Sequence, residues 1–377
     1  MSFSFGFSGD DIEHDVDESL TQIPAITSQT QAPASYSAFP VAGKPQIPAT
    51  RHALSDFLSQ LPSKLAYDLL DIDVADDGAS ETRLRLPRRE LWDVRVQLMA
   101  EDDEVVDGED RVDDGGLGKH DVKTGIYEGG FKSWESSIDL VKVLAAQDEL
   151  TAAQQASSFR VIELGCGTAL PSLAMFTWIM QRQSRNQWHQ RPCSFVLADY
   201  NPSVLRLVTL PNFVLAWALH NTQDPVLQDA FSIEGELELS PSIVQAFEQF
   251  LSSSSIDLSF ISGAWSPEFI SCLYDLPAFS TGLPAPTTLM VGAETIYSPF
   301  ALQAFTQTIF TILEQERGSG ATAAAYVAAK RLYFGVGGSL DDFIEAARSK
   351  GATVSELREE SEGVRRGVVH CILQQQS

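Results

Sequence analysis

A short glycine turn between two apolar stretches is the first place in the sequence where residue types and spacing could do chemistry. Residues 160–164 are mostly apolar and β-branched, which predicts a buried strand. Gly165 and Gly167 follow in a tight turn, and because they lack a Cβ atom a ligand can approach their backbone closely. Residues 170–180 then show helical apolar spacing, and the helix N-terminus offers free N–H groups. This order predicts the opening unit of a nucleotide-binding α/β sheet.

Two acidic residues accompany this unit. Glu163 lies in the predicted strand, and Asp199 ends the next one. A dinucleotide-binding fold would need a third glycine where Leu170 stands, and an acidic residue about 20 residues further on. Asp199 comes later than that, after a polar insertion at 181–192. The pattern therefore departs from the dinucleotide fingerprint.

The segment ELGCGT instead resembles the first motif of the seven-strand S-adenosylmethionine (SAM) methyltransferases. In that superfamily an acidic residue at the end of the second strand binds the ribose hydroxyls, and Asp199 occupies that place. A G-x-G after a strand is a weak signal alone. It gains specificity here from Glu163 upstream and Asp199 downstream.

The charge of the chain is unbalanced. Its 377 residues include 51 acidic and 26 basic side chains, a formal net charge of −25. A protein that grips nucleic acid through phosphates needs a basic surface, so this balance argues against direct nucleic-acid binding. A basic protein partner is favoured, although solubility alone could account for the charge. Residues 1–121 hold 25 acidic and 10 basic residues, so the acidity is concentrated in the N-terminal third.

The four cysteines lie far apart and form no C-x-x-C pair, which argues against a zinc site and fits a reducing compartment. No apolar run is expected to reach the length of a membrane span. The N-terminus also lacks the basic start and apolar centre of a signal peptide. We therefore expect a cytoplasmic and nuclear protein with no metal and no membrane partner. We also expect a monomer.

Composition divides the chain into three regions: 1–50, 51–121 and 122–377. Residues 1–50 are rich in Ser, Pro, Gln, Ala and acidic residues and are expected to be mostly disordered. Phe3, Phe5 and Phe7 alternate with small residues at the start. They would suit an added edge strand or a docking peptide, or else belong to a mobile tail.

The second region is expected to be an N-terminal extension. Residues 54–70 are predicted to be helical, with a break at Pro62. Apolar alternation in 82–99 predicts one or two strands, with Pro87 at an edge or turn. These strands are expected to belong to an N-terminal hairpin. The acidic run 101–114 is expected to be a solvated loop, and a substrate-attracting role is the alternative.

The third region predicts an α/β fold with a seven-strand, Rossmann-like sheet and helices on both faces. The strands are expected at 160–164, 194–199, 257–262, 287–292, 321–329, 353–357 and 368–373. Asn201 is expected to cap the helix that begins at Pro202. Seven strands with intervening helices is the full number for the resembled superfamily.

Acidic and aromatic residues follow these strands, where ligands bind in doubly wound sheets. Glu294 and Tyr297 come after strand 287–292 and are the candidate catalytic residues. Glu294 could instead cap the helix near Pro299. Trp265 follows the predicted strand 257–262. In the resembled superfamily the loop after that strand runs beside the adenine of the cofactor, so Trp265 could lie near it, or it could be an aromatic residue of the loop with no such role.

One family shares several further stretches with this sequence. The chain resembles the eukaryotic protein-histidine N-methyltransferases of the methyltransferase-like class in MSFSFGF, GIYEGGFKSWESS, ELGCGTALP, DYNPSVLRLVTLPN, SGAW, ETIYS and KRLYFGVGG. The best-known member acts on a histidine of a large-subunit ribosomal protein. The resemblance implies SAM as cofactor and a basic protein, expected to be ribosomal, as substrate. Around SAM it would place Ser133, Trp134, Glu135, Ser136, Ser137, Glu163, Gly165, Gly167, Asp199, Tyr200, Asn201, Gly263, Ala264, Trp265, Ala293 and Thr295.

Methylation of a histidine by SAM mainly requires that the acceptor nitrogen, the methyl group and the sulfur are aligned. A histidine with its ordinary pKa of about 6.5 is mostly uncharged at neutral pH, so one ring nitrogen is free to attack. A group that accepts the other ring N–H would select which nitrogen reacts. Two alternatives stay open: a lysine or small-molecule methyltransferase on the same fold, and a non-catalytic scaffold. The unbroken set Glu163, Gly165, Gly167 and Asp199 counts against the scaffold.

Overall fold

The computed structural model of the chain describes the parts of the sequence that build its sheets and their helices. The described residues are 40, 42–74, 83–103, 129–147, 149–150, 157–188, 191–279, 286–333, 337–361 and 363–374. All of them fall within one structural unit, Ser35–Ser377.

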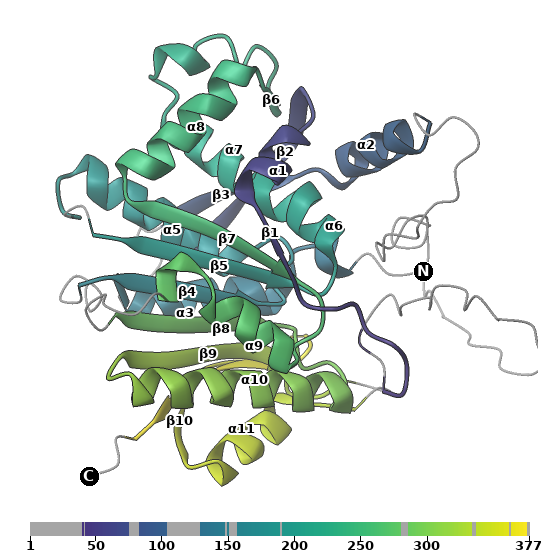
Figure 1. The fold of residues 1–377 in the computed structure, drawn as a ribbon, viewed down its shortest axis with the longest axis vertical. Coiled ribbons are helices and arrows are strands. Elements are labelled where there is room, and N and C mark those ends of the chain that lie inside the picture. The colour runs from purple at the N-terminus through teal and green to yellow at the C-terminus, as the bar shows by residue number, and fades with distance from the viewer. Residues whose placement is uncertain are drawn as a thin grey trace, which may run out of the picture. The chain divides into compact units, whose positions relative to one another are not determined.

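A mostly parallel sheet of eight strands lies at the centre of this unit, in the order β1-β7-β5-β4-β8-β9-β11-β10 (Figure 1). Its strands are β1 (Thr50–His52), β4 (Phe159–Leu164), β5 (Cys193–Asp199), β7 (Ile256–Ser262), β8 (Thr287–Ala293), β9 (Thr322–Lys330), β10 (Ala352–Glu360) and β11 (Arg366–Leu373). The strands from β7 to β9 in this order are parallel, whereas β1 is antiparallel to β7 and β11 to both its neighbours. The seven predicted strands and the predicted fold class are confirmed. The short strand β1 is an addition that the sequence did not predict.

Helices cover both faces of this sheet. They are α3 (Glu135–Gln147), α5 (Leu170–Ser184), α6 (Pro202–Val204), α7 (Leu210–His220), α8 (Pro241–Ser253), α9 (Pro267–Tyr274), α10 (Pro299–Gly318) and α11 (Leu340–Ser349). One apolar core joins the sheet to α3, α5, α7 and α8, and a second joins it to α9, α10 and α11. Neighbouring residues of β5 alternate between them: Phe195 and Leu197 enter the first core, Val196 and Ala198 the second. A strand buried on both faces needs this nearly continuous apolar sequence.

We expected no apolar run as long as a membrane span, but one helical run reaches that length. The run Pro202–His220 is long enough to cross a bilayer and has a mean hydropathy of 1.4, but 78% of it is buried inside the protein. The core helix of a globular domain has the same properties. Its start is capped as predicted, because the Asn201 side chain accepts the N–H of Ser203 at 2.9 Å.

A small antiparallel sheet contains the expected N-terminal hairpin, which pairs the first half of the predicted segment 82–99 with an earlier segment that was predicted to be helical. Its order is β3-β2-β6, with β2 at Lys64–Asp73, β3 at Arg83–Arg89 and β6 at Glu236–Glu238. Pro87 lies on the edge strand β3, as expected for a residue without an N–H. The predicted helix 54–70 is wrong in its second half, because α1 (Leu54–Ser59) ends before Pro62 and β2 follows. Burial of apolar β2 side chains against the core outweighs their helix propensity.

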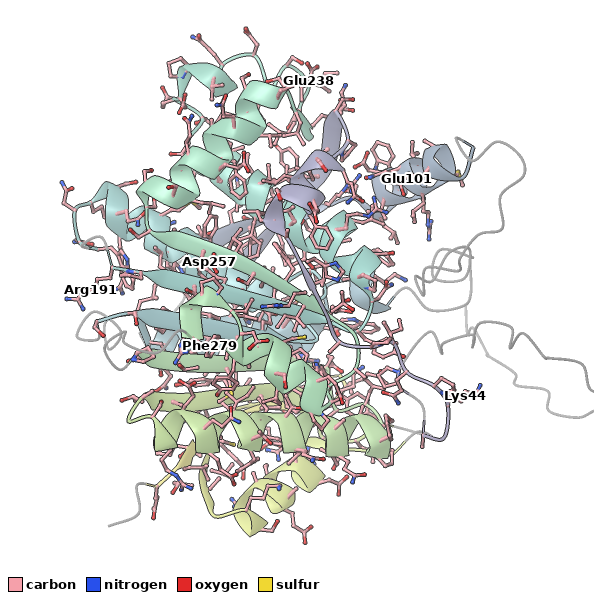
Figure 2. The ribbon with its side chains drawn as sticks, viewed as in Figure 1. Lys44, Glu101, Arg191, Glu238, Asp257 and Phe279 are labelled. Carbon is pink, nitrogen blue, oxygen red and sulfur yellow. The ribbon has the colours of Figure 1, made fainter. Side chains whose placement is uncertain are left out.

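The second half of the predicted hairpin is also wrong, since it forms the helix α2 (Leu91–Asp103). Leu91, Val94 and Leu98 have helical spacing and pack into one small apolar cluster, whereas Val96, which completed the apparent alternation, is 56% exposed. The start of the predicted acidic loop belongs to this helix. There Glu101 forms an ion pair with Arg206 at 2.7 Å (Figure 2). Residues 104–114 lie outside the described residues.

Residues 42–52, which begin in the N-terminal region, are ordered, so the disorder expected for most of residues 1–50 does not extend to the end of that region. We call these residues the strap. Ile47 is buried, and its carbonyl accepts the N–H of Ala264 at 2.9 Å. At Gly263 (φ +98°) a Cβ atom would lie 2.2 Å from the carbonyl oxygen of Pro48, so only glycine lets the strap pass so closely. Residues 1–39 and 41, including the segment with Phe3, lie outside the described residues.

Candidate active site

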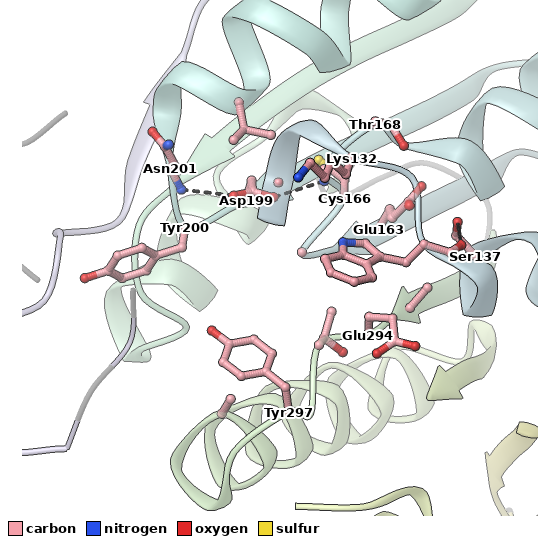
Figure 3. A pocket seen from close by; sticks show the side chains of 18 of the residues that line it. Lys132, Ser137, Glu163, Cys166, Thr168, Asp199, Tyr200, Asn201, Glu294 and Tyr297 are labelled. Carbon is pink, nitrogen blue, oxygen red and sulfur yellow. Dashed lines mark hydrogen bonds between the residues drawn. The ribbon is translucent and has the colours of Figure 1, made fainter. Parts of the chain in front are cut away.

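A pocket opens at the carboxyl ends of β4, β5, β7 and β8, where ligands bind in doubly wound sheets (Figure 3). Most of the residues singled out from the sequence line it: Trp134, Ser137, Glu163, Gly165, Gly167, Asp199, Tyr200, Asn201, Gly263, Trp265, Ala293, Glu294, Thr295 and Tyr297. They come from segments far apart in the sequence, and the sheet brings them together.

The glycine turn after β4 gives the pocket a wall made of main chain. Gly165 (φ +67°) and Gly167 (φ +51°) are both left-handed. A Cβ atom at Gly165 would lie 2.5 Å from Cγ2 of Thr295. The hydroxyl of Thr209 donates to the carbonyl of Gly167 at 2.6 Å and holds the turn. Glycine alone tolerates both the conformation and the close approach, so this wall depends on residue type.

The carboxylate of Asp199 is held by main-chain donors at the end of β5. It accepts the N–H of Gly167 and the N–H of Asn201, each at 3.0 Å (Figure 3). Burial raises the pKa of Asp199 to about 6, although these donors oppose the shift. A carboxylate has about four lone-pair sites, so Asp199 can still accept hydrogen bonds from hydroxyls of a ligand.

Glu163 adds a second buried carboxyl group beneath the turn. Its Oε2 accepts the N–H of Ser172, near the start of α5, at 3.0 Å. Burial raises the pKa of Glu163 to about 8, and the charge of Asp199 acts in the same direction. Glu163 is therefore mostly protonated at neutral pH in the free protein, and the pocket carries less negative charge than its sequence implies.

The β7 side of the pocket combines aromatic rings with buried donors. The hydroxyl of Tyr200 accepts the N–H of Ile47 at 3.1 Å, so the strap supports this side. The rings of Trp265 and Phe305 pack with centroids 5.5 Å apart. The indole N–H of Trp265 and the hydroxyl of Thr295 are buried with no hydrogen-bond partner among the described residues. Buried polar groups are seldom left unpaired, which makes these two suited to a bound ligand.

The approach to α3 brings an aromatic ring to the pocket. Trp134, directly before the helix, lines the pocket and is 39% exposed. The hydroxyl of Ser137 donates to the carbonyl of Trp134 at 2.6 Å, which fixes the first turn. The Trp134 ring is therefore within reach of a ligand in the pocket.

The remaining residues singled out from the sequence, Ser133, Glu135, Ser136 and Ala264, do not line the pocket. The hydroxyls of Ser133 and Thr168 form a hydrogen bond of 3.0 Å. Glu135 is exposed at the start of α3, and Ala264 donates its N–H to the strap. Ser136 reaches the pocket indirectly, through Glu294.

Glu294 directly follows β8 and has a left-handed backbone, φ +59°, which is uncommon for any residue but glycine. Its side chain is only 8% exposed. The hydroxyl of Ser136 donates to Oε1, and the hydroxyl of Tyr333 donates to Oε2 at 2.7 Å. Nζ of Lys330 lies 3.7 Å from the same Oε2. The carboxylate is thus fixed from two sides.

The alternative role for Glu294, as a cap of α10, is wrong. That helix is capped by Ser298, whose hydroxyl accepts the N–H of Ala301 at 3.1 Å. Figure 3 shows Glu294 and Asp199 on opposite walls of the pocket, with the ring of Tyr297 extending into it. Glu294 is therefore available to a ligand rather than to the helix.

Sequence reasoning missed several residues of the site. Pro40, Gly130, Lys132, Cys166, Thr168, Val204 and Ala301 also line the pocket. Tyr333 does not line it but bonds to Glu294, 39 positions earlier in the chain. The stretch KRLYFGVGG pointed to this segment as a whole, but nothing in its spacing connected Tyr333 to Glu294.

The residues present fit SAM. The described residues contain no group of three His, Cys, Asp or Glu side chains that could hold a metal ion. They do offer a carboxylate for ribose hydroxyls at Asp199, a glycine main chain open to close approach, and buried donors without partners at Trp265 and Thr295. These features match an organic cofactor with a sugar and polar ends.

Comparison with solved structures and with family models adds little. No family model matches the chain. The N-terminal domain of human METTL16 in complex with SAH superposes with a TM-score of 0.35 and 10% identity, over 64% of this chain and 72% of that chain. A score this low supports no conclusion about function.

Comparison with characterised proteins is far more informative. The chain is 34% identical over 365 residues to histidine protein methyltransferase 1 of Saccharomyces cerevisiae, which covers 91% of this chain and 89% of that protein. The protein of the same name from Schizosaccharomyces pombe is 34% identical over 307 residues, or 79% of this chain and 77% of that protein. A homologue from Bos taurus is 27% identical over 58% of this chain. The chain therefore belongs to the histidine protein methyltransferase 1 family of SAM-dependent enzymes.

Proposed function

We propose that this enzyme methylates a ring nitrogen of a histidine in a basic protein of the large ribosomal subunit. The likeness to histidine protein methyltransferase 1 over 91% of the chain is the observation that chiefly supports the acceptor type. The net charge of −25 favours a basic protein as partner. The ribosomal identity rests on the sequence resemblance. Such a substrate would be met in the cytoplasm or the nucleus.

The protein itself aligns the cofactor with the acceptor and places a charged group near the acceptor ring. When bound, SAM supplies a methyl group on a positively charged sulfur, which an uncharged histidine nitrogen can attack. In this proposal the Asp199 carboxylate, the glycine turn and Trp134 hold the cofactor, and Tyr297, which lines the same pocket, faces the acceptor. Holding two reactants in attack geometry can supply several kcal/mol of the barrier reduction.

Glu294 orients the acceptor ring. Its carboxylate is fixed by Ser136 and Tyr333, yet it retains lone pairs that can accept the N–H of the non-reacting ring nitrogen. That N–H becomes more acidic as the ring takes up the methyl group and becomes a cation. A carboxylate beside it therefore stabilises the transition state more than the ground state, which is the condition for raising turnover.

The product distinguishes this proposal from the lysine alternative. The purified enzyme should transfer label from SAM to a protein of the large ribosomal subunit. Acid hydrolysis of that protein should release methylhistidine and no methyllysine. Replacing the labelled histidine in the substrate should abolish labelling, and the enzyme variant Asp199→Ala provides the control for background transfer. Methyllysine as the main product would refute the proposal.

A further inference from the structure

The hydroxyl of Tyr333 is well placed to govern the direction of the Glu294 carboxylate. It donates to Oε2 at 2.7 Å, and its own position is set by the N–H of Lys330, which approaches it at 3.4 Å. Burial and the charge of Glu294 raise the pKa of Tyr333, so it keeps its proton and remains a donor. Lys330 adds a cation 5.5 Å from the centre of the Tyr333 ring.

Glu294 depends on such contacts because its main chain adopts an unfavourable conformation. A non-glycine residue at φ +59° is strained and persists only where neighbouring groups fix it. The N–H of Glu294 is bound by the carbonyl of Ala328 at 2.9 Å, and the two hydroxyls of Ser136 and Tyr333 fix the other end. These side chains belong to α3 and to the segment after β9, so their grip depends on tertiary structure.

We propose that Tyr333 is a positioning residue that decides which ring nitrogen of the acceptor histidine is methylated. The inference rests on the proposed function of Glu294. In the reaction, the lone pair of the attacking nitrogen forms the N–C bond while the electrons of the S–C bond pass to sulfur. The ring becomes a cation with its N–H on the other nitrogen, and that proton then passes to water. A carboxylate fixed in one direction accepts that N–H from one ring orientation only.

Loss of the Tyr333 hydroxyl leaves Oε2 without its strongest donor among the described residues. Ser136 then still holds Oε1, but Oε2 can change its direction. The acceptor ring can therefore bind in two orientations. Both nitrogens would be presented to the methyl group. The expected result is slower turnover and a mixture of two methylhistidine isomers.

The test compares the wild-type enzyme with Tyr333→Phe, which removes a single oxygen. Turnover at saturating SAM should fall about tenfold, as for loss of a hydrogen bond to a charged group. The second methylhistidine isomer should rise from a trace to at least about a tenth of the product. The Kd of SAM should stay within about twofold. Isomers are separated by chromatography after hydrolysis, and the Kd is measured by calorimetry.

A matched control exists in Tyr326→Phe. The hydroxyl of the buried Tyr326 also donates to a glutamate, but that glutamate, Glu149, does not line the pocket, whereas Glu294 does. This variant should keep both wild-type turnover and the wild-type isomer ratio. Should Tyr333→Phe fail to fold, Ser136→Ala removes the other anchor of Glu294 and should give the same mixture.

The outcomes separate the inference from the function beneath it. A wild-type enzyme that makes no methylhistidine overturns both. A single isomer from Tyr333→Phe and from Ser136→Ala, whatever their turnover, overturns only the positioning role. An isomer mixture from Tyr333→Phe with none from Tyr326→Phe supports it.

Discussion

Two walls of the pocket are held by different kinds of contact. The Asp199 wall, made of Gly165, Gly167, Asp199 and Asn201, is fixed by main-chain donors and left-handed glycines. The Glu294 wall is held from behind the pocket lining by the side chains of Ser136, on α3, and of Lys330 and Tyr333, at the end of β9 and just after it. The first wall joins the strand–turn–helix unit of β4 to the end of its neighbouring strand β5 through main-chain donors, whereas the second depends on side chains from distant segments.

This difference predicts a separation of effects. Changes in the Asp199 wall and its support should alter stability or the affinity for SAM. Changes in the Glu294 wall should alter turnover or product at saturating SAM, because in the proposed function that wall contacts the acceptor.

The largest expected effect concerns the strap that supports the Asp199 wall. Ile47 is 7% exposed, and its N–H binds the hydroxyl of Tyr200. Ile47→Ala should lower the free energy of unfolding by roughly 2–5 kcal/mol, measured by chemical denaturation. Ile233→Ala is the control, because Ile233 is 50% exposed and should change stability by less than about 0.5 kcal/mol. Equal effects of the two substitutions would show that the strap is not a structural part of the wall.

The next effect concerns the cofactor. Removing the charged acceptor by Asp199→Ala should cost roughly 1.5–3 kcal/mol of binding, which is at least about a tenfold rise in the Kd of SAM. Asp257→Ala changes an exposed aspartate at the start of the neighbouring strand β7 (Figure 2) and should leave the Kd unchanged. Calorimetry measures both. An unchanged Kd for Asp199→Ala in a folded protein would contradict the assignment.

A smaller effect is the pH dependence of SAM binding. Burial raises the pKa of Asp199 to about 6, so the carboxyl group takes up a proton as the pH falls through 6. The neutral group binds ribose hydroxyls more weakly, and the affinity should fall about tenfold between pH 7 and pH 5. Asp199→Asn should flatten this dependence. A wild-type affinity that stays constant over this range would contradict it.

The same shift has the opposite sign for the stability of the free protein. The folded-state pKa of Asp199 lies above its ordinary value, so folding is favoured by the protonated form. That contribution is complete below about pH 4 and is lost as the pH rises through 6.

The sequence was sufficient for the part of the site that depends on local rules. The order of strand, glycine turn and helix predicted the places of Gly165 and Gly167, because glycine is the residue that adopts such a turn most readily. Asp199 was predicted from the resemblance, which places an acidic residue at the end of the second strand. The seven strands could be predicted because each is a short apolar run buried on both faces. Asn201 could be predicted as a cap from its place before a proline.

The sequence was insufficient where tertiary contacts decide. The strap looked unable to bury apolar surface, but one isoleucine and three paired residues are enough once β7 is present. Helix α2 looked like a strand because Val94, Val96 and Leu98 alternate, while its buried face has helical spacing. Tyr333 could not be connected to Glu294, since a single hydrogen bond between distant segments has no sequence pattern.

The most direct test of the account is the rate of methyl transfer by Glu294→Gln at saturating SAM, in a single turnover, together with its Kd for SAM. The substitution keeps the size of the side chain and removes the charge that faces the acceptor ring. The account predicts a rate at least about tenfold below wild type and a Kd within about twofold of it, because the lost interaction strengthens in the transition state. A wild-type rate would contradict the role of Glu294, and a loss confined to SAM affinity would place Glu294 in the cofactor wall instead.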